Sequence, residues 1–149
     1  MLETLFAPRG IAVIGASRDK AKLGYGVARN LINSGFSGAI HFIHPHADQI
    51  LGRRCFATIE AAPDPIDLVI VIVPAAQVPQ TIEACGRRGI QWAIIVSGGF
   101  RESDRAGANL EEQILSIARR YGLRLIGPNC IGLIDTHLPV NTTFIKSVP

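Results

Sequence analysis

A short apolar run that ends in glycine, followed by a basic loop and an amphipathic segment, constrains this chain most strongly. Residues 11–14 read Ile-Ala-Val-Ile, and Gly15 follows them directly. Such a run is typical of a strand buried on both faces of a parallel sheet, and a glycine after it permits a sharp turn close to a ligand. From Gly24 to Gly35, apolar residues recur at helical spacing. The pattern predicts a strand, a glycine-containing turn and a helix.

The loop between Gly15 and Gly24 differs from the usual dinucleotide-binding fingerprint. That fingerprint, G-x-G-x-x-G, places its glycines within about six residues, whereas eight residues separate these two glycines. The longer loop carries a hydroxyl group and basic side chains, at Ser17, Arg18 and Lys22 among others. Because a helix N-terminus also attracts anions, the loop predicts a site for a ligand with more phosphate than NAD. The alternative is a solvated loop whose basic residues serve only solubility.

Composition excludes several classes of function. The chain has 149 residues, enough for one domain, and 48% of them are apolar, which suits a sheet covered on both faces. A net charge of +3 without a basic stripe argues against nucleic-acid binding. No apolar run approaches the roughly 20 residues of a membrane helix. The three cysteines are widely spaced and form no C-x-x-C motif, so we expect neither a disulfide framework nor a metal site, and a cytoplasmic location.

The alternation of strand and helix continues along the chain. Further strands are expected at 39–43, 67–73, 93–96 and 123–126, with helices between most of them and a loop at 49–55. This order predicts an α/β fold, a Rossmann-like, doubly wound and mainly parallel sheet with helices on both faces. We expect one domain over residues 1–134. Residues 135–149 have no clear periodicity and are expected to form a tail or linker.

In such a sheet the ligand binds at the carboxyl ends of the strands. The segments expected there are rich in Gly, Pro, Ser and Asn: 15–24, 44–45, 74–75, 97–99 and 127–132. An NAD site requires a carboxylate after the second strand, but His44-Pro45 stands there and the next acidic residue is Asp48. An imidazole beside a basic loop better suits a phosphorylated ribose, as in NADP or coenzyme A. A solvated loop histidine is the alternative for His44.

Four motifs carry a resemblance to a known family. They are Ile-Ala-Val-Ile-Gly-Ala-Ser at 11–17, Val-Pro-Ala at 73–75, Ser-Gly-Gly-Phe at 97–100 and Gly-Pro-Asn-Cys-Ile-Gly at 127–132. From about Leu5 to Phe144, the chain resembles the N-terminal CoA-binding domain of NDP-forming acyl-CoA synthetases, a module similar to the succinyl-CoA synthetase α subunit. The resemblance implies an enzyme that interconverts acyl-CoA, NDP and phosphate with acid, CoA and NTP.

The resemblance also implies which residues bind CoA or acyl-CoA. The 15–24 loop would hold the pyrophosphate, the segment after residue 73 would line the adenine or pantetheine, residues 96–98 would offer backbone groups to the pantetheine, and the motif at 127–132 would lie near the thiol. His44 stands where relatives often carry Asn or Lys. The candidate binding residues are Gly15, Ala16, Ser17, Arg18, Lys22, Gly24, His44, Pro45, Val73, Pro74, Ala75, Val96, Ser97, Gly98, Asn129 and Cys130.

No catalytic residue is expected in this chain. No histidine or carboxylate has a spacing that marks it as the base for Cys130, so this residue is expected to be a small side chain in a tight turn. The phosphohistidine and nucleotide-grasp domains that the resemblance implies do not fit in 149 residues. They are the expected partners, in the same or another chain, with a homodimer as a further possibility.

Four other functions remain open from the sequence. The domain is also found as the regulatory part of fused protein lysine acetyltransferases, and a stand-alone CoA-binding protein would look the same. An NADP-dependent oxidoreductase domain would bind nicotinamide, although the glycine fingerprint is missing. A domain used only for protein contacts would leave the glycine-rich and proline-rich strand ends unexplained.

Overall fold

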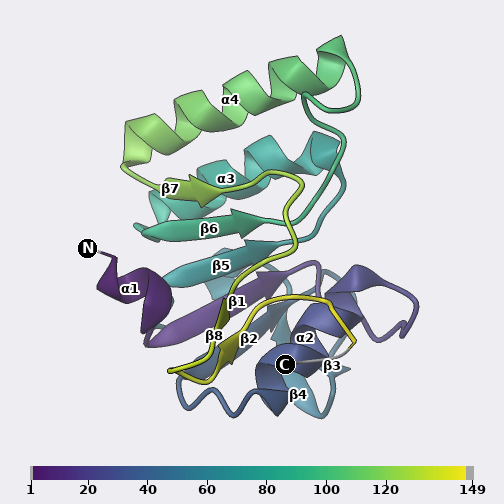
Figure 1. Cartoon of the computed structure of the whole chain (residues 1–149), viewed down its shortest axis with the longest axis vertical. Helices are drawn as coiled ribbons and strands as arrows, with labels where there is room; N and C mark the ends of the chain where they lie inside the picture. Colours follow the sequence, from purple (N-terminus) through teal and green to yellow (C-terminus); the bar gives the residue numbers. More distant parts are fainter. Residues whose placement is uncertain (1, 147–149) are drawn as a thin grey trace.

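A seven-stranded sheet forms the middle layer of the computed structural model, which describes residues 2–146 (Figure 1). Its strand order is β3-β4-β2-β1-β5-β6-β7, and all neighbours pair in parallel except β3 with β4. The strands are β1 (Gly10–Ile14), β2 (Ala39–Ile43), β3 (Gln49–Ile50), β4 (Arg53–Phe56), β5 (Leu68–Val71), β6 (Trp92–Ile95) and β7 (Arg124–Ile126). The predicted Rossmann-like α/β fold is confirmed.

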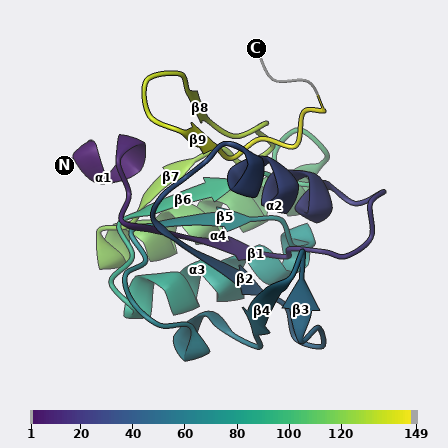
Figure 2. The same cartoon turned by 90° about the horizontal axis from the view of Figure 1, so that it is seen from below.

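Helices cover both faces of the sheet, as predicted. α2 (Leu23–Asn33) lies on one face, and α3 (Val78–Arg87) and α4 (Arg105–Tyr121) lie on the other (Figure 2). Shorter helical segments are α1 (Glu3–Phe6), η1 (Ile59–Ala61) and η2 (Ala75–Gln77). In β1, Ile11 and Val13 pack toward α2, while Ala12 and Ile14 pack toward α3 and α4, so the strand is buried on both faces. Among the described residues, no helix is long and apolar enough to cross a bilayer.

The segment expected as a loop at 49–55 is instead a β-hairpin. β3 and β4 pair antiparallel across Leu51 and Gly52, and both residues have positive φ, 50° and 75°. Positive φ at both central positions is typical of the tight turns that join hairpin strands, but such turns usually carry Asn-Gly or Asp-Gly. Leu-Gly does not give that signal, so the hairpin was missed. β4 then extends the parallel sheet beside β2.

Residues 134–146, here called the strap, are packed against the domain rather than forming the expected tail from residue 135. β8 (Ile134–Asp135) and β9 (Val140–Asn141) pair antiparallel, and the strap then crosses α2. The buried side chain of Asn30 on α2 donates hydrogen bonds of 2.8 Å to the carbonyl oxygens of Thr143 and Ile145. These contacts join residues 113 and 115 positions apart in the sequence, and Val140 and Phe144 of the strap also pack against the core. Such isolated long-range contacts leave no hydrophobic periodicity in the sequence. The last three residues of the expected tail lie outside the described residues.

His41 on β2 gives the fold a dependence on pH. Its side chain is buried with the ring edge-on to Phe56, and its Nε2 atom has no hydrogen-bond partner among the described residues. Burial, helped by the positive charge of Arg88, lowers the pKa of His41 below its ordinary value. The unfolded chain therefore binds more protons than the folded chain between the lowered pKa and about 6.5, and stability falls as the pH drops through this window.

We expect His41→Phe to remove part of this acid sensitivity. Between about pH 7.5 and about pH 5.5, the melting temperature of the wild-type chain should fall further than that of the variant, because phenylalanine fills the site without a titrating nitrogen. The other histidines titrate in both proteins, so the difference between the two pH profiles isolates His41. Parallel profiles in thermal unfolding would show that His41 is not responsible.

Candidate functional site

The parallel register brings the carboxyl ends of five strands to one edge of the sheet. Three backbone hydrogen bonds show this. The N–H of Gly15 donates to the carbonyl oxygen of Ile43, the N–H of Ile72 donates to the carbonyl oxygen of Ile14, and the N–H of Val96 donates to the carbonyl oxygen of Val71. The loops after β1, β2, β5, β6 and β7 therefore lie side by side at this edge (Figure 1). Every candidate residue from the sequence lies in one of these loops or directly beside it.

The turn between β1 and α2 can be built only from glycine at two positions. Gly15 has φ +97°, and a Cβ atom there would lie 2.6 Å from the carbonyl oxygen of Ile72. A Cβ atom on Gly24, in the first turn of α2, would lie 2.0 Å from the carbonyl oxygen of Gly15. Both distances are far below van der Waals contact, so the start of α2 abuts the end of β1 with no room for side chains.

The N-terminus of α2 has the properties of an anion site. Lys22 is the N-cap residue in an extended conformation, it makes no side-chain cap, and the first turn contains no acidic residue. The preceding loop is held by its own groups, because Ser17 Oγ accepts from the N–H of Asp19 at 3.1 Å and Asp19 Oδ1 accepts from the N–H of Ala21 at 2.9 Å. An uncapped helix start beside a lysine attracts phosphate through amide groups and charge.

His44 has a structural role that the sequence did not indicate. Its Nδ1 atom accepts hydrogen bonds from the N–H groups of His46 (3.0 Å) and Ala47 (2.9 Å). Burial and the positive charges of His46, Arg18 and Lys22 lower the pKa of His44. The ring is therefore held in the neutral form with its proton on Nε2, which is the nitrogen left to donate to a ligand. Arg18 and Lys22, two of the three basic residues in the 15–24 loop, are thus within electrostatic reach of the end of β2.

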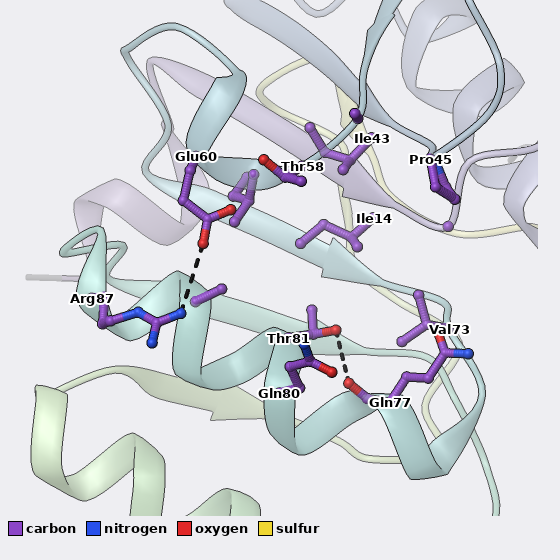
Figure 3. Close-up of a pocket in the computed structure, with 14 residues that line it drawn as sticks. Ile14, Ile43, Pro45, Thr58, Glu60, Val73, Gln77, Gln80, Thr81 and Arg87 are labelled. Atoms are coloured by element: carbon purple, nitrogen blue, oxygen red, sulfur yellow. Dashed lines mark hydrogen bonds and ion pairs between the residues drawn. The ribbon is translucent and has the colours of Figure 1, made fainter.

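A pocket of about 480 Å³ opens between η1 and α3 at the same sheet edge. Figure 3 shows Ile14 and Ile43 on one side of it and Thr81, from α3, on the other. At one end Glu60 and Arg87 form an ion pair at 3.8 Å. The lining residues are Ile14, Gly15, Ile43, Pro45, Ala57, Thr58, Ile59, Glu60, Val73, Gln77, Gln80, Thr81, Ala84 and Arg87.

Only three of these lining residues, Gly15, Pro45 and Val73, were candidates from the sequence. The others are the last residues of β1 and β2, the segment after β4, Gln77 of η2 and the side of α3 next to its buried face. They meet only because the crossover after β5 lays α3 over the ends of β1 and β2. No local motif marks them, so the sequence could not identify them.

The loops after β5, β6 and β7 are joined by hydrogen bonds. Ser97 Oγ donates to the carbonyl oxygen of Val73 at 2.5 Å, and the N–H of Asn129 donates to the carbonyl oxygen of Ser97 at 3.0 Å. Cys130 Sγ lies 3.3 Å from the carbonyl oxygen of Ile95, and burial raises the pKa of its thiol. The side chains of Ser97 and Cys130 are thus used within the protein, and Val96 is buried in the core. This region offers a ligand backbone groups and the side chain of Asn129.

Metal binding has no support in the part of the chain that the structure describes. Residues 2–146 contain no group of three or more His, Cys, Asp and Glu side chains placed to hold a metal ion. The three cysteines are free thiols, and two of them are buried.

Comparison with known proteins gives consistent matches over nearly the whole chain. The family described as CoA binding domain matches residues 9–136. The ADP-forming acetate–CoA ligase I of Archaeoglobus fulgidus is 41% identical over 148 residues, which cover 99% of this chain and 21% of that enzyme. Subunit alpha of the ADP-forming acetate–CoA ligase II of Pyrococcus furiosus is 40% identical over 145 residues, which cover 97% of this chain and 32% of the subunit.

Solved structures agree with these matches. A dinucleotide-forming acetyl-coenzyme A synthetase 1 from Ca. Korarchaeum cryptofilum, in complex with phosphate and ADP, superposes with a TM-score of 0.93 at 38% identity, and the match covers 99% of this chain and 32% of that one. The present chain spans between about a fifth and a third of the length of these relatives. The resemblance stated from the motifs is confirmed, and the chain belongs to the CoA binding domain family, as a domain of the kind found in ADP-forming acyl-CoA synthetases.

Proposed function

We propose that this chain is the CoA-binding part of a longer acyl-CoA ligase that interconverts acyl-CoA, NDP and phosphate with acid, CoA and NTP. One observation carries the proposal: the pocket, the uncapped start of α2 and the joined loops after β5, β6 and β7 lie along a single sheet edge. They suit in turn the adenosine, the phosphates and the pantetheine arm of CoA. The ligase relatives, which match nearly the whole chain, supply the reaction class.

The phosphates of CoA would be held by the loop at 15–24. The amide groups at the start of α2 and the side chain of Lys22 suit the pyrophosphate. Arg18, Lys22 and the Nε2–H of His44 together suit the additional phosphate on the ribose, because the positive charges of Arg18 and Lys22 act on the His44 ring. After β2, where an NAD site places a carboxylate for the ribose, this chain has His44 and Pro45. This favours CoA over NAD.

The adenosine would occupy the pocket between η1 and α3. Its volume of about 480 Å³ lies within the roughly 300–1,000 Å³ that is typical of small-molecule sites. Ile14 and Ile43 offer apolar surface to a flat base, and Thr58 and Gln80 offer hydrogen-bonding groups. Pro74 and Ala75 follow Val73 at the edge of the pocket and continue toward the loop after β6.

This chain would bind and orient CoA, while the rest of the enzyme would perform the chemistry. The thiol of the ligand is the reacting group, and the thiol of Cys130 is a poor competitor because its pKa is raised by burial. We propose that downstream ligase domains, in the same or another chain, supply the phosphoryl-transfer groups, and that the protein works in the cytoplasm. Regulation of a fused lysine acetyltransferase would use the same CoA site, but no observation favours it.

Filling the pocket should block CoA binding. We expect Thr81→Trp to weaken the affinity for CoA by about tenfold or more, because the indole occupies space needed by the base. The affinity of the variant for adenosine 3′,5′-bisphosphate should fall by the same factor. Isothermal titration calorimetry measures both, with Gln113→Trp on the exposed side of α4 as the control. Unchanged CoA affinity in a folded Thr81→Trp variant would remove the adenosine from this pocket.

A further inference from the structure

The loop after β6 is held by the carboxylate of Glu102. Its Oε1 atom accepts hydrogen bonds from the N–H of Gly99 at 2.6 Å and from the N–H of Phe100 at 3.1 Å. Gly99 has φ +97°, and the side chain of Phe100 is fully buried, so the loop turns sharply and Phe100 anchors its far end in the core. Two consecutive amide groups on one carboxylate oxygen fix the path of the backbone through residues 98–100.

Glu102 lies where the loops after β5, β6 and β7 meet. A Cβ atom built on Gly98 would lie 3.3 Å from Glu102 Oε1 and 3.3 Å from Asn129 Oδ1. A Cβ atom built on Gly99 would lie 3.1 Å from the Cβ atom of Ala75. The carboxylate therefore supports the same backbone that the pantetheine arm is proposed to follow. Glu102 itself is solvent-exposed, so its contacts order the loop and add nothing to the hydrophobic core.

We propose that Glu102 is a positioning residue for the thiol-bearing arm of CoA: it holds the backbone of residues 98–100 in the conformation that receives the pantetheine. This inference rests on the proposed CoA site and adds a residue that no motif resemblance indicated. A preformed loop increases affinity because the ordering of its backbone is completed before the ligand binds.

The charge of Glu102 is compatible with this position. The N–H groups of Phe100, of Glu102 itself and of Gly99 lower the pKa of the carboxyl below its ordinary value, so the group is ionised at neutral pH. The charges of CoA are all on its phosphates, which would be bound by the loop after β1. The loop after β6 is proposed to face the uncharged arm of the ligand, so the carboxylate of Glu102 does not oppose the phosphates there.

The test compares a whole ligand with its adenosine half. Calorimetry of Glu102→Ala should show CoA binding about tenfold weaker than in the wild type, with unchanged binding of adenosine 3′,5′-bisphosphate, which lacks the arm. Glu102→Gln should recover part of the loss because its Oε1 atom can still accept both hydrogen bonds. Glu112→Ala, which removes the same charge from an exposed position on α4, should bind both ligands like the wild type.

A second readout follows the loop without any ligand. Hydrogen exchange at the Gly99 and Phe100 amides should be faster in Glu102→Ala than in Glu102→Gln. Three results would overturn the inference: unchanged CoA affinity in Glu102→Ala, equal losses for CoA and the bisphosphate, or unchanged exchange at both amides. None of these three results would argue against the proposed CoA site, provided that the wild-type chain binds CoA. Failure of the wild type to bind CoA would instead overturn both.

Discussion

Replacing Gly24 with alanine is expected to lower the free energy of unfolding by about 3 kcal/mol, although the change adds only one methyl group. That methyl would lie 2.0 Å from the carbonyl oxygen of Gly15 and 3.1 Å from its carbonyl carbon. Both neighbours are backbone atoms, so relief requires α2 to move away from β1. In an ordinary helix, alanine is more favourable than glycine by up to about 1 kcal/mol. A loss of stability must therefore come from the close approach of helix and strand.

Urea unfolding of the variant measures this effect. Gly89→Ala is the matched control, because Gly89 has φ +75° and a Cβ atom there would meet nothing within 4 Å. It should cost only about 1 kcal/mol, from backbone strain alone. Since Gly24 also positions the amide groups at the start of α2, its alanine variant should bind CoA more weakly even where it remains folded. A Gly24→Ala protein as stable as the wild type would contradict the close packing described here.

The fold was predictable where burial on two faces leaves a continuous apolar run. β1 and β5 lie where such runs indicated strands, and Gly35 follows the end of the helix expected after β1. The hairpin of β3 and β4 was missed because its turn, Leu51-Gly52, lacks the residues that usually mark one. The strap could not be predicted because it is held by hydrogen bonds to Asn30 and by two separate apolar residues, Val140 and Phe144, which form no regular period.

The arrangement of the candidate loops was predictable, but their detail was not. The rule that ligands bind at the carboxyl ends of parallel strands indicated which loops the fold would bring to one edge. It could not show that the side chains of Ser97 and Cys130 point to backbone carbonyl oxygens. It also could not show that the Nδ1 atom of His44 accepts hydrogen bonds from two backbone amides. The rule also could not predict that α3 and η1 lie next to each other and form the pocket. Which of these residues touch CoA stays a prediction.

The largest loss of ligand affinity is expected when two cations are removed from the first loop. Arg18→Ala combined with Lys22→Ala should weaken CoA binding by about 100-fold, because each cation is proposed to make a charge-assisted contact with phosphate. The loss should shrink as salt is added. The preference for CoA over dephospho-CoA should also decrease, since both side chains lie near His44 at the ribose end.

The control removes the same charge elsewhere. Arg105→Ala combined with Arg119→Ala changes two exposed arginines of α4 and should leave CoA affinity as it is in the wild type. If the two double variants lost affinity equally, the effect would reflect net charge, and the first loop would not be the phosphate site.

Calorimetric titration of the wild-type chain with CoA, dephospho-CoA, NADP and NAD tests the central claim most directly. We expect CoA to bind most tightly, dephospho-CoA to bind more weakly because it lacks the ribose phosphate, and the two nicotinamide cofactors to bind more weakly still. Tighter binding of NADP than of CoA, or no binding of CoA, would contradict the assignment of this sheet edge to CoA.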